Sequence, residues 1–183
     1  MSKLLSKFIA AAVIYFSVAC SSCGRSEATD AELPNFHQIN EHLYRGAQPK
    51  AGGIEKLAQI GIKTIVDLRD DEQARAEEEE ARSAGLGYVN IPFSNLRRPT
   101  DEQIERVLAV INLPENQPVF VHCRRGADRT GTVSAVYRIE HDGWTSEQAI
   151  DEADSYGMRP WQLGMKQFIR DYYQVRLAKR NDK

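Results

Sequence analysis

The chain has 183 residues, of which 27% are charged, and its formal net charge is −2 at pH 7. A length of this order suits one domain with a short appendage. The chain as a whole has no basic excess, so its composition gives no support to a nucleic-acid partner, and we expect none.

The first 19 residues differ in composition from the rest. Lys3 and Lys7 precede the apolar run "FIAAAVIYFSV" at residues 8–18. This run is shorter than the about 20 residues that span a bilayer and is typical of the apolar region of a secretory signal peptide. We therefore predict a signal peptide over residues 1–19 and a domain that is exported to the periplasm or held outside the cytoplasm. An uncleaved anchor would place the domain in the same compartment.

The cysteines divide between this leader and the domain. Cys20 follows "SVA", which resembles a bacterial lipoprotein signal and implies lipidation of Cys20 and membrane anchoring, although Ser17 stands where Leu, Val or Ile is usual. Cys23 lies in the small, polar stretch 20–34, which we expect to be a linker. The expected domain, 35–183, retains only Cys123, so no disulfide framework holds its core.

The first half of this domain alternates strand and helix signals. One or two short strands are expected within "FHQINEHLYRGAQP", and a short helix in "AGGIEKLAQIG" ends at Gly61. The β-branched core of "IKTIVDLRD" predicts a buried strand. The polar segment "DEQARAEEEEARSAG" predicts a helix whose run Glu77–Glu80 is expected to face solvent.

The second half repeats the alternation and then becomes helical. "GYVNIPF" and "QPVFVHC" predict strands, separated by a helix that Thr100 caps and that continues to about Ile111. Three helices follow, over about 130–143, 145–157 and 161–179. This order predicts an α/β fold with a mostly parallel sheet flanked by helices.

The stretch "VFVHCRRGADRTG" carries the chemistry. It predicts a buried strand, a seven-residue loop and a helix that begins at Thr130. In open α/β sheets ligands bind beyond the carboxyl ends of strands, where a helix N-terminus offers free N–H groups to an anion. Gly126 lets the loop curl inward, and Arg129 matches phosphate oxygens with two donors. The same positive field stabilises a thiolate at Cys123.

The residues "HCRRGADRTG" resemble the H-C-x-x-G-x-x-R-[ST]-G signature of the cysteine-dependent phosphatases, the protein-tyrosine and dual-specificity superfamily. With "LYRGAQP" and "KTIVDLRD", the resemblance extends over about 35–179 and favours the small bacterial dual-specificity-like branch. It implies hydrolysis of phosphomonoesters on tyrosine, serine or threonine of proteins, or on phosphoinositides, through a phosphocysteine intermediate.

The resemblance also implies roles for individual residues. Cys123 attacks phosphorus, Arg129 holds the phosphate, and Thr130 bonds the sulfur and helps it leave. The loop residues expected to bind the substrate are Arg124, Arg125, Gly126 and Ala127. Arg124 and Arg125 occupy variable positions of the loop, where they either widen the positive rim of the pocket or are solvated. The chemistry requires no cofactor and no metal, and the four histidines show no metal-ligand spacing.

The general acid is the open assignment. In much of the superfamily an aspartate supplies the proton from the loop that here reads "IPFSNLRRPTDEQI", where the expected position falls at Ser94 or Asn95. Asp101 is the first carboxylate there, and it also suits stabilisation of a helix start. Asp128 is the other candidate: it is either the proton donor, and then the base of the second step, or a partner that orients an arginine.

Some charged residues, and the activity itself, allow two interpretations from the sequence. Asp67, Arg69 and Asp70 either pair structurally or rim the site, with structure favoured, and Arg45 either reaches the cleft or stays on a hairpin. Arg97 and Arg98 either recruit an acidic substrate or are solvated.

The chain could also be a pseudophosphatase that binds phosphorylated ligands without turnover. A sulfur-transfer or arsenate-reducing enzyme is disfavoured, because the domain lacks a second cysteine.

Overall fold

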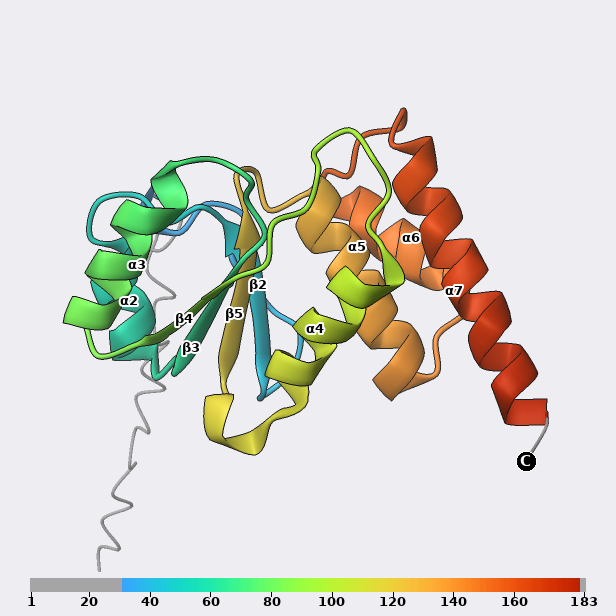
Figure 1. The fold of residues 1–183 in the computed structure, drawn as a ribbon, viewed down its shortest axis with the longest axis horizontal. Coiled ribbons are helices and arrows are strands. Elements are labelled where there is room, and N and C mark those ends of the chain that lie inside the picture. The colour runs from blue at the N-terminus through green and yellow to red at the C-terminus, as the bar shows by residue number, and fades with distance from the viewer. Residues whose placement is uncertain (1–30, 182–183) are drawn as a thin grey trace, which may run out of the picture.

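One five-stranded sheet organises the domain. The computed structural model describes residues 31–181 (Figure 1). The strands lie in the order β1-β2-β5-β3-β4, and all neighbours are parallel except the antiparallel pair β1 and β2. The strand bounds are β1 His37–Gln38, β2 Leu43–Ala47, β3 Thr64–Asp67, β4 Gly87–Asn90 and β5 Val119–Cys123. The mostly parallel α/β fold expected from the sequence is confirmed.

Helices cover both faces of this sheet. Figure 1 shows α2 and α3 on one face and α4 to α7 on the other. The bounds are α2 Gly53–Ile60, α3 Gln73–Ser83, α4 Asp101–Asn112, α5 Asp128–Tyr137, α6 Ser146–Ser155 and α7 Leu163–Asn181, with a short turn at Pro114–Asn116 and a π-helical turn at Arg138–Asp142. Among residues 31–181, no helix has the length and apolar character needed to cross a membrane.

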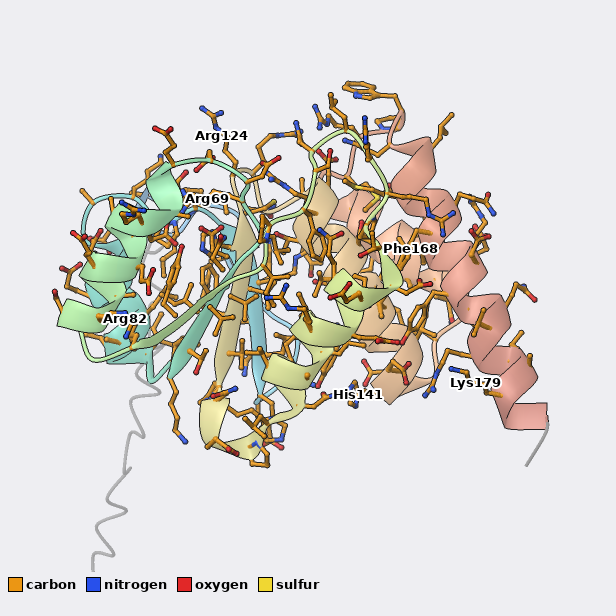
Figure 2. The ribbon with its side chains drawn as sticks, in the orientation of Figure 1. Arg69, Arg82, Arg124, His141, Phe168 and Lys179 are labelled. Carbon is orange, nitrogen blue, oxygen red and sulfur yellow. The ribbon has the colours of Figure 1, made fainter. Side chains whose placement is uncertain are left out.

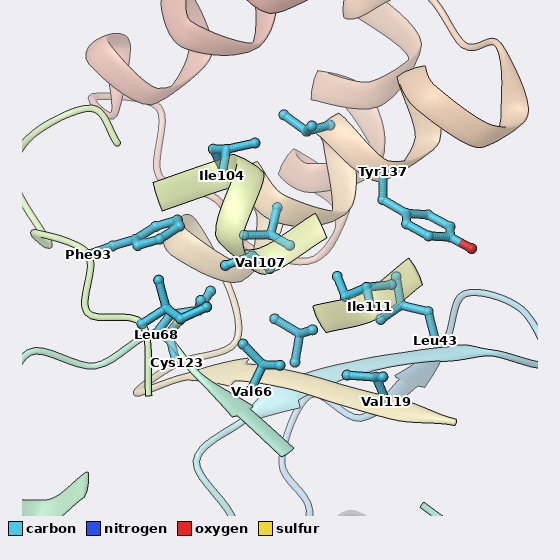
Figure 3. Close-up of a cluster of buried hydrophobic side chains, with 14 of the residues drawn as sticks. Leu43, Val66, Leu68, Phe93, Ile104, Val107, Ile111, Val119, Cys123 and Tyr137 are labelled. Atoms are coloured by element: carbon cyan, nitrogen blue, oxygen red, sulfur yellow. The ribbon is translucent and has the colours of Figure 1, made fainter. Parts of the chain in front are cut away.

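The central strands are buried on both faces, as parallel strands between helical layers must be. Val66 of β3 and Val121 of β5 pack into the core beneath α4 and α5, which Figure 3 shows with Cys123 at its edge. Ile65 and Phe120, one residue out of phase, pack toward α2 and α3. β5 therefore lies in the middle of the sheet with its carboxyl end fixed from both sides.

Local signals at the helix ends agree with the sequence. Gly61 ends α2 in the left-handed conformation, with φ of 94°. Thr100 and Thr145 each form a capping box with the glutamine three residues later, at the starts of α4 and α6. The expected strands and helices are all present, and their ends shift by a few residues.

The start of the folded domain differs from the expectation. Leu33 is fully buried in the core beside α2, although it falls in the stretch predicted as linker. The carbonyl of Pro34 also accepts a hydrogen bond from the Ala47 N–H. Ordered packing thus begins before Asn35. The predicted signal peptide and Cys20 lie outside the described residues and stay predictions.

Candidate active site

The catalytic loop joins the middle strand to the most buried helix. Cys123 is the last residue of β5, and α5 begins at Asp128, so the loop between them lies at the carboxyl edge of the sheet. All ten residues of α5 are buried. The structure brings the expected strand, loop and helix together. The N–H groups at the N-terminus of α5 face the loop, as an anion site requires.

Gly126 forms the sharp bend of this loop. Its φ is 66°, and a Cβ placed on it would lie 2.4 Å from the carbonyl carbon of Gly46 in β2. The Gly126 carbonyl accepts hydrogen bonds from Arg45 Nη2 at 2.8 Å and from Asn35 Nδ2 at 3.1 Å. Arg45 is fully buried and its guanidinium lies 4.4 Å from the centre of the Tyr156 ring. Arg45 therefore supports the loop from beneath, which resolves its open placement.

The Cys123 thiol is nearly inaccessible, with 3% of the residue exposed. Burial raises its pKa, but the neighbouring Thr130 hydroxyl and N–H, the positive charge of Arg129 and the Arg125 N–H together hold the pKa below the ordinary value of a cysteine. A thiolate is the nucleophilic form of cysteine. The surroundings of Cys123 thus favour the reactive form of the nucleophile.

Alkylation tests this arrangement. The rate constant for inactivation by iodoacetate should rise with pH through an inflection below the ordinary pKa of cysteine, because only the thiolate reacts. Thr130→Ala should move the inflection upward and slow alkylation at pH 6.5 by about tenfold, since a shift of one pKa unit changes the thiolate fraction tenfold. Ser134→Ala, which removes another buried hydroxyl of α5, should leave the profile unchanged. An equal shift in both variants would contradict the role given to Thr130.

Arg129 is oriented through one of its nitrogens. Nη1 donates to Asp70 Oδ1 at 2.8 Å, to the Leu68 carbonyl at 3.2 Å and to the Phe93 carbonyl at 3.1 Å. Within residues 31–181, no acceptor takes Nε or Nη2 at hydrogen-bonding distance. A guanidinium held at one end keeps a pair of donors for phosphate oxygens. Asp70 therefore belongs to the site as a partner of Arg129, whereas the sequence favoured a structural role for it.

A small hollow of about 60 Å³ lies over the sulfur. Its lining consists of Asn95, Cys123, Arg124, Arg125, Asp128, Arg129 and Arg159. Arg124 and Arg125 are exposed at its rim, whereas Gly126 and Ala127 are buried in the turn itself. The volume is suited to a single phosphoryl group rather than to a larger ligand.

Asp128 is the only carboxylate in that lining. It is 3% exposed, and both of its oxygens accept hydrogen bonds from Arg159: Oδ1 from the backbone N–H at 2.9 Å and Oδ2 from Nε at 2.8 Å. Arg159 comes from the segment between α6 and α7, and no spacing in the sequence indicated it. Asp128 thus lies at the catalytic hollow, as the sequence predicts, and is paired with Arg159, which the sequence did not indicate.

The loop between β4 and α4 supplies no acid to this hollow. Ser94 accepts hydrogen bonds from the N–H groups of Leu96 and Arg97, as in a turn, and Asn95 alone of the loop lines the hollow. Asp101 is exposed at the first position of α4 and lines a different hollow, between α4 and α7. Its place therefore agrees with stabilisation of the helix start.

A buried charged cluster lies behind the catalytic strand, and it corrects one expectation. Glu77 was expected on a solvated helix face, but only 6% of it is exposed, because it turns inward. Glu77 Oε2 pairs with Arg69 Nη2 at 2.7 Å and Oε1 with His122 Nε2 at 2.7 Å. Arg69 also pairs with Asp67 at 2.7 Å. Burial lowers the pKa of His122, yet the bond and charge of Glu77 raise it overall.

The cluster does not suit a metal ion. Asp67, Glu77 and His122 could each offer one ligand atom within a small space. Arg69 already donates to both carboxylates, so its guanidinium supplies the positive charge that a cation would bring. The four ionisable groups instead brace β5 one residue before the nucleophile.

Breaking this cluster should destabilise the domain. Glu77→Gln is expected to lower the free energy of unfolding by about 3 kcal/mol, because it removes the buried carboxylate that contacts both Arg69 and His122. The pKa of His122 is raised in the folded state, so its interaction with Glu77 stabilises the folded protein fully at pH values below the pKa of an unfolded histidine. This stabilisation is lost as the pH rises through the folded-state pKa. The difference in unfolding free energy between Glu77→Gln and wild type, measured by urea unfolding, should therefore become smaller at alkaline pH. Glu79→Gln, on the exposed face of α3, should change stability by less than about 0.5 kcal/mol.

A cysteine of lowered pKa, an arginine with free donors and backbone N–H groups near the sulfur, at a strand–helix junction, define the cysteine-dependent phosphatase class of site. A family model described as "DSP-PTPase phosphatase fused to NAD+ Kinase" matches residues 16–171. The chain belongs to this family of dual-specificity-type phosphatase domains.

Individual relatives agree with the family. The dual specificity protein phosphatase TpbA of Pseudomonas aeruginosa (strain UCBPP-PA14) is 31% identical over 134 residues, which cover 72% of this chain and 58% of TpbA. The inositol diphosphatase DSP4 of Arabidopsis thaliana is 25% identical over 140 residues, which cover 74% of this chain and 70% of that protein. The chain thus spans less than two thirds of the length of TpbA.

Solved structures share the fold. The crystal structure of P. aeruginosa TpbA aligns with a TM-score of 0.66 at 27% identity, covering 79% of this chain and 89% of that chain. A cysteine-to-serine variant of TpbA in complex with pTyr aligns with the same TM-score and identity, covering 80% and 91%. The likeness therefore extends over about four fifths of this chain.

Proposed function

We propose that this protein hydrolyses phosphomonoesters through a phosphocysteine intermediate, with phosphorylated proteins or phosphoinositides as substrates. The observation that carries the proposal is the juxtaposition of a Cys123 thiol of lowered pKa and an Arg129 fork around one hollow. The TpbA complex with pTyr and the naming of relatives as phosphatases support the reaction class.

The first step transfers the phosphoryl group to sulfur. The Cys123 thiolate attacks phosphorus, the bond from phosphorus to the ester oxygen breaks, and the sulfur–phosphorus bond forms. Arg129 and the N–H groups of the loop stabilise the charge on the equatorial oxygens. In the second step water attacks phosphorus and the thiolate leaves, with the Thr130 hydroxyl donating to it.

The leaving oxygen requires a proton in the first step. Asp128 is the donor in this proposal, because no other carboxylate lines the hollow. A proton on Asp128 breaks its ion pair with Arg159, which frees that guanidinium to bind a phosphate oxygen. In the second step the Asp128 carboxylate takes a proton from water.

Asp128→Asn tests this assignment. Loss of a general acid should lower kcat by about 10²-fold on an alkyl phosphate, whose leaving oxygen is strongly basic, and much less on an activated aryl phosphate. The measurement is kcat on both substrates. Asp101→Asn serves as the control and should leave both values near wild type. An equal loss on both substrates in Asp128→Asn would assign that residue to the orientation of Arg159 alone.

A substrate panel tests the function itself. Phosphate release from an aryl phosphate, phosphotyrosine and phosphoserine peptides, phosphoinositides and inositol polyphosphates should show turnover of at least one by the wild-type chain. A chain that binds these compounds, seen as protection of Cys123 from alkylation, but releases no phosphate would be a pseudophosphatase. The panel therefore separates catalysis from recognition.

A further inference from the structure

The most exposed large apolar side chains of the described domain gather beside the catalytic hollow. Leu96 is 85% exposed, Leu163 71% and Trp161 69%. The next such residue, Val175, is 53% exposed and lies further along α7. Exposed apolar groups that cluster mark a surface for interaction rather than a random scatter.

Two segments that carry these side chains are bonded together over the site. Gln162 Nε2 donates to the Asn95 carbonyl at 3.0 Å, and Arg159 Nη2 donates to Asn95 Oδ1 at 3.2 Å. Asn95 and Arg159 line the hollow over Cys123. Arg159 also lies over the Trp161 ring, 5.6 Å from its centre. The two segments that carry the exposed apolar side chains therefore meet beside the site, and these side chains are here called the apolar lip: Leu96, Trp161 and Leu163.

Positive charges without partners accompany the apolar lip. Arg97 and Arg124 are exposed, and neither forms an ion pair with any residue of the described range 31–181. Arg124 projects outward from the ribbon (Figure 2). The acidic residues Asp71 and Glu72 immediately precede α3 and line a separate hollow with Arg75 and Tyr88. Arg97 thus places a positive charge next to Leu96 in the chain, and Arg124 places one at the rim of the hollow.

We infer that the apolar lip docks on the surface of an anionic lipid bilayer and that the substrate is a phosphomonoester on a lipid headgroup. Tryptophan and leucine side chains insert into the interfacial layer of a bilayer, and neighbouring arginines bind its anionic headgroups. Side chains exposed by 69–85% are protruding tips, which enter a fluid interface but give a peptide no groove. This inference rests on the proposed phosphatase activity.

Docking is tested with Trp161 as the reporter. The chain has two tryptophans, so the full-length Cys123→Ser/Trp144→Phe variant leaves only Trp161. We expect vesicles of phosphatidylcholine with phosphatidylinositol 4-phosphate to shift its fluorescence to the blue, and brominated phosphatidylcholine to quench it. An N-terminal lipid anchor would not produce quenching of Trp161 by itself. Fluorescence that stays unchanged by both kinds of vesicle overturns the inference.

Turnover tests the substrate. Leu96→Ser/Leu163→Ser should lower kcat/KM on vesicle-bound phosphatidylinositol 4-phosphate by about tenfold or more, and should leave its soluble dibutanoyl analogue unaffected. Leu113→Ser/Val175→Ser, which alters two exposed apolar residues away from the site, should match wild type on both. An equal loss on the soluble analogue, or a loss confined to phosphotyrosine peptides, overturns the inference in favour of soluble substrates. If the wild-type chain hydrolyses none of the phosphomonoesters, the proposed function is wrong. The Trp161 fluorescence experiment still tests membrane docking in that case.

Discussion

Cys123→Ser should reduce kcat on an aryl phosphate by about 10⁴-fold or more, because removal of a nucleophile leaves only transition-state binding. Serine replaces a thiol whose pKa the site lowers with a hydroxyl that stays protonated at neutral pH. The fold should be retained although Cys123 is buried, because serine has the same shape as cysteine and is only slightly smaller. Initial rates of phosphate release provide the measurement.

The control for this variant is its ability to bind phosphate. Cys123→Ser should still bind a phosphotyrosine peptide or a phosphoinositide, because Arg129 and the loop N–H groups are unchanged. Activity within about tenfold of wild type would show that another group attacks phosphorus. Loss of both binding and turnover would show that the sulfur holds the loop in place instead.

Gly126→Ala should abolish the site by a different route. The added Cβ would lie 2.4 Å from the Gly46 carbonyl carbon and 2.5 Å from the Ala47 nitrogen, both of them backbone atoms of β2. The strand cannot yield without disturbing the sheet, so the loop must open and its N–H groups must turn away from the phosphate. We expect kcat/KM to fall by about 10³-fold, as when the donors of a transition-state cradle are lost.

Gly143→Ala is the control that introduces backbone strain without a steric clash. Gly143 has a similar φ of 69°, but a Cβ there meets nothing within 4 Å. It should cost about 1 kcal/mol of stability through the left-handed backbone alone and leave kcat/KM unchanged. A similar, small effect of both glycine substitutions on activity would contradict the close approach of the loop to β2.

The sequence predicts best what depends on neighbours along the chain. The β-branched run of β3, the cap at Thr100 and the stop at Gly61 are local signals, and each appears at its expected place. The catalytic loop is also local, since its nucleophile, bend and arginine lie within seven residues. The fold class and most of the site could therefore be predicted.

Contacts between distant segments could not be predicted in the same way. Glu77 belongs to a run of four glutamates, and nothing local distinguishes the one that turns inward to Arg69 and His122. Arg159 meets Asp128 from 31 positions away, and Arg45 reaches the Gly126 carbonyl from 81 positions away. These partners depend on how α3 packs on β4, α6 on α5 and β2 on β5, which composition and periodicity do not specify.

Trapping of the phosphocysteine intermediate is the decisive experiment for the proposed mechanism. Wild-type chain mixed with an aryl phosphate and quenched in acid within its first turnover should carry one phosphoryl group, and peptide mass spectrometry should place it on Cys123. Asp128→Asn should accumulate more of this species if its second step is slowed more than its first. Turnover without any phosphoenzyme, or a phosphoryl group on another residue, would contradict the mechanism.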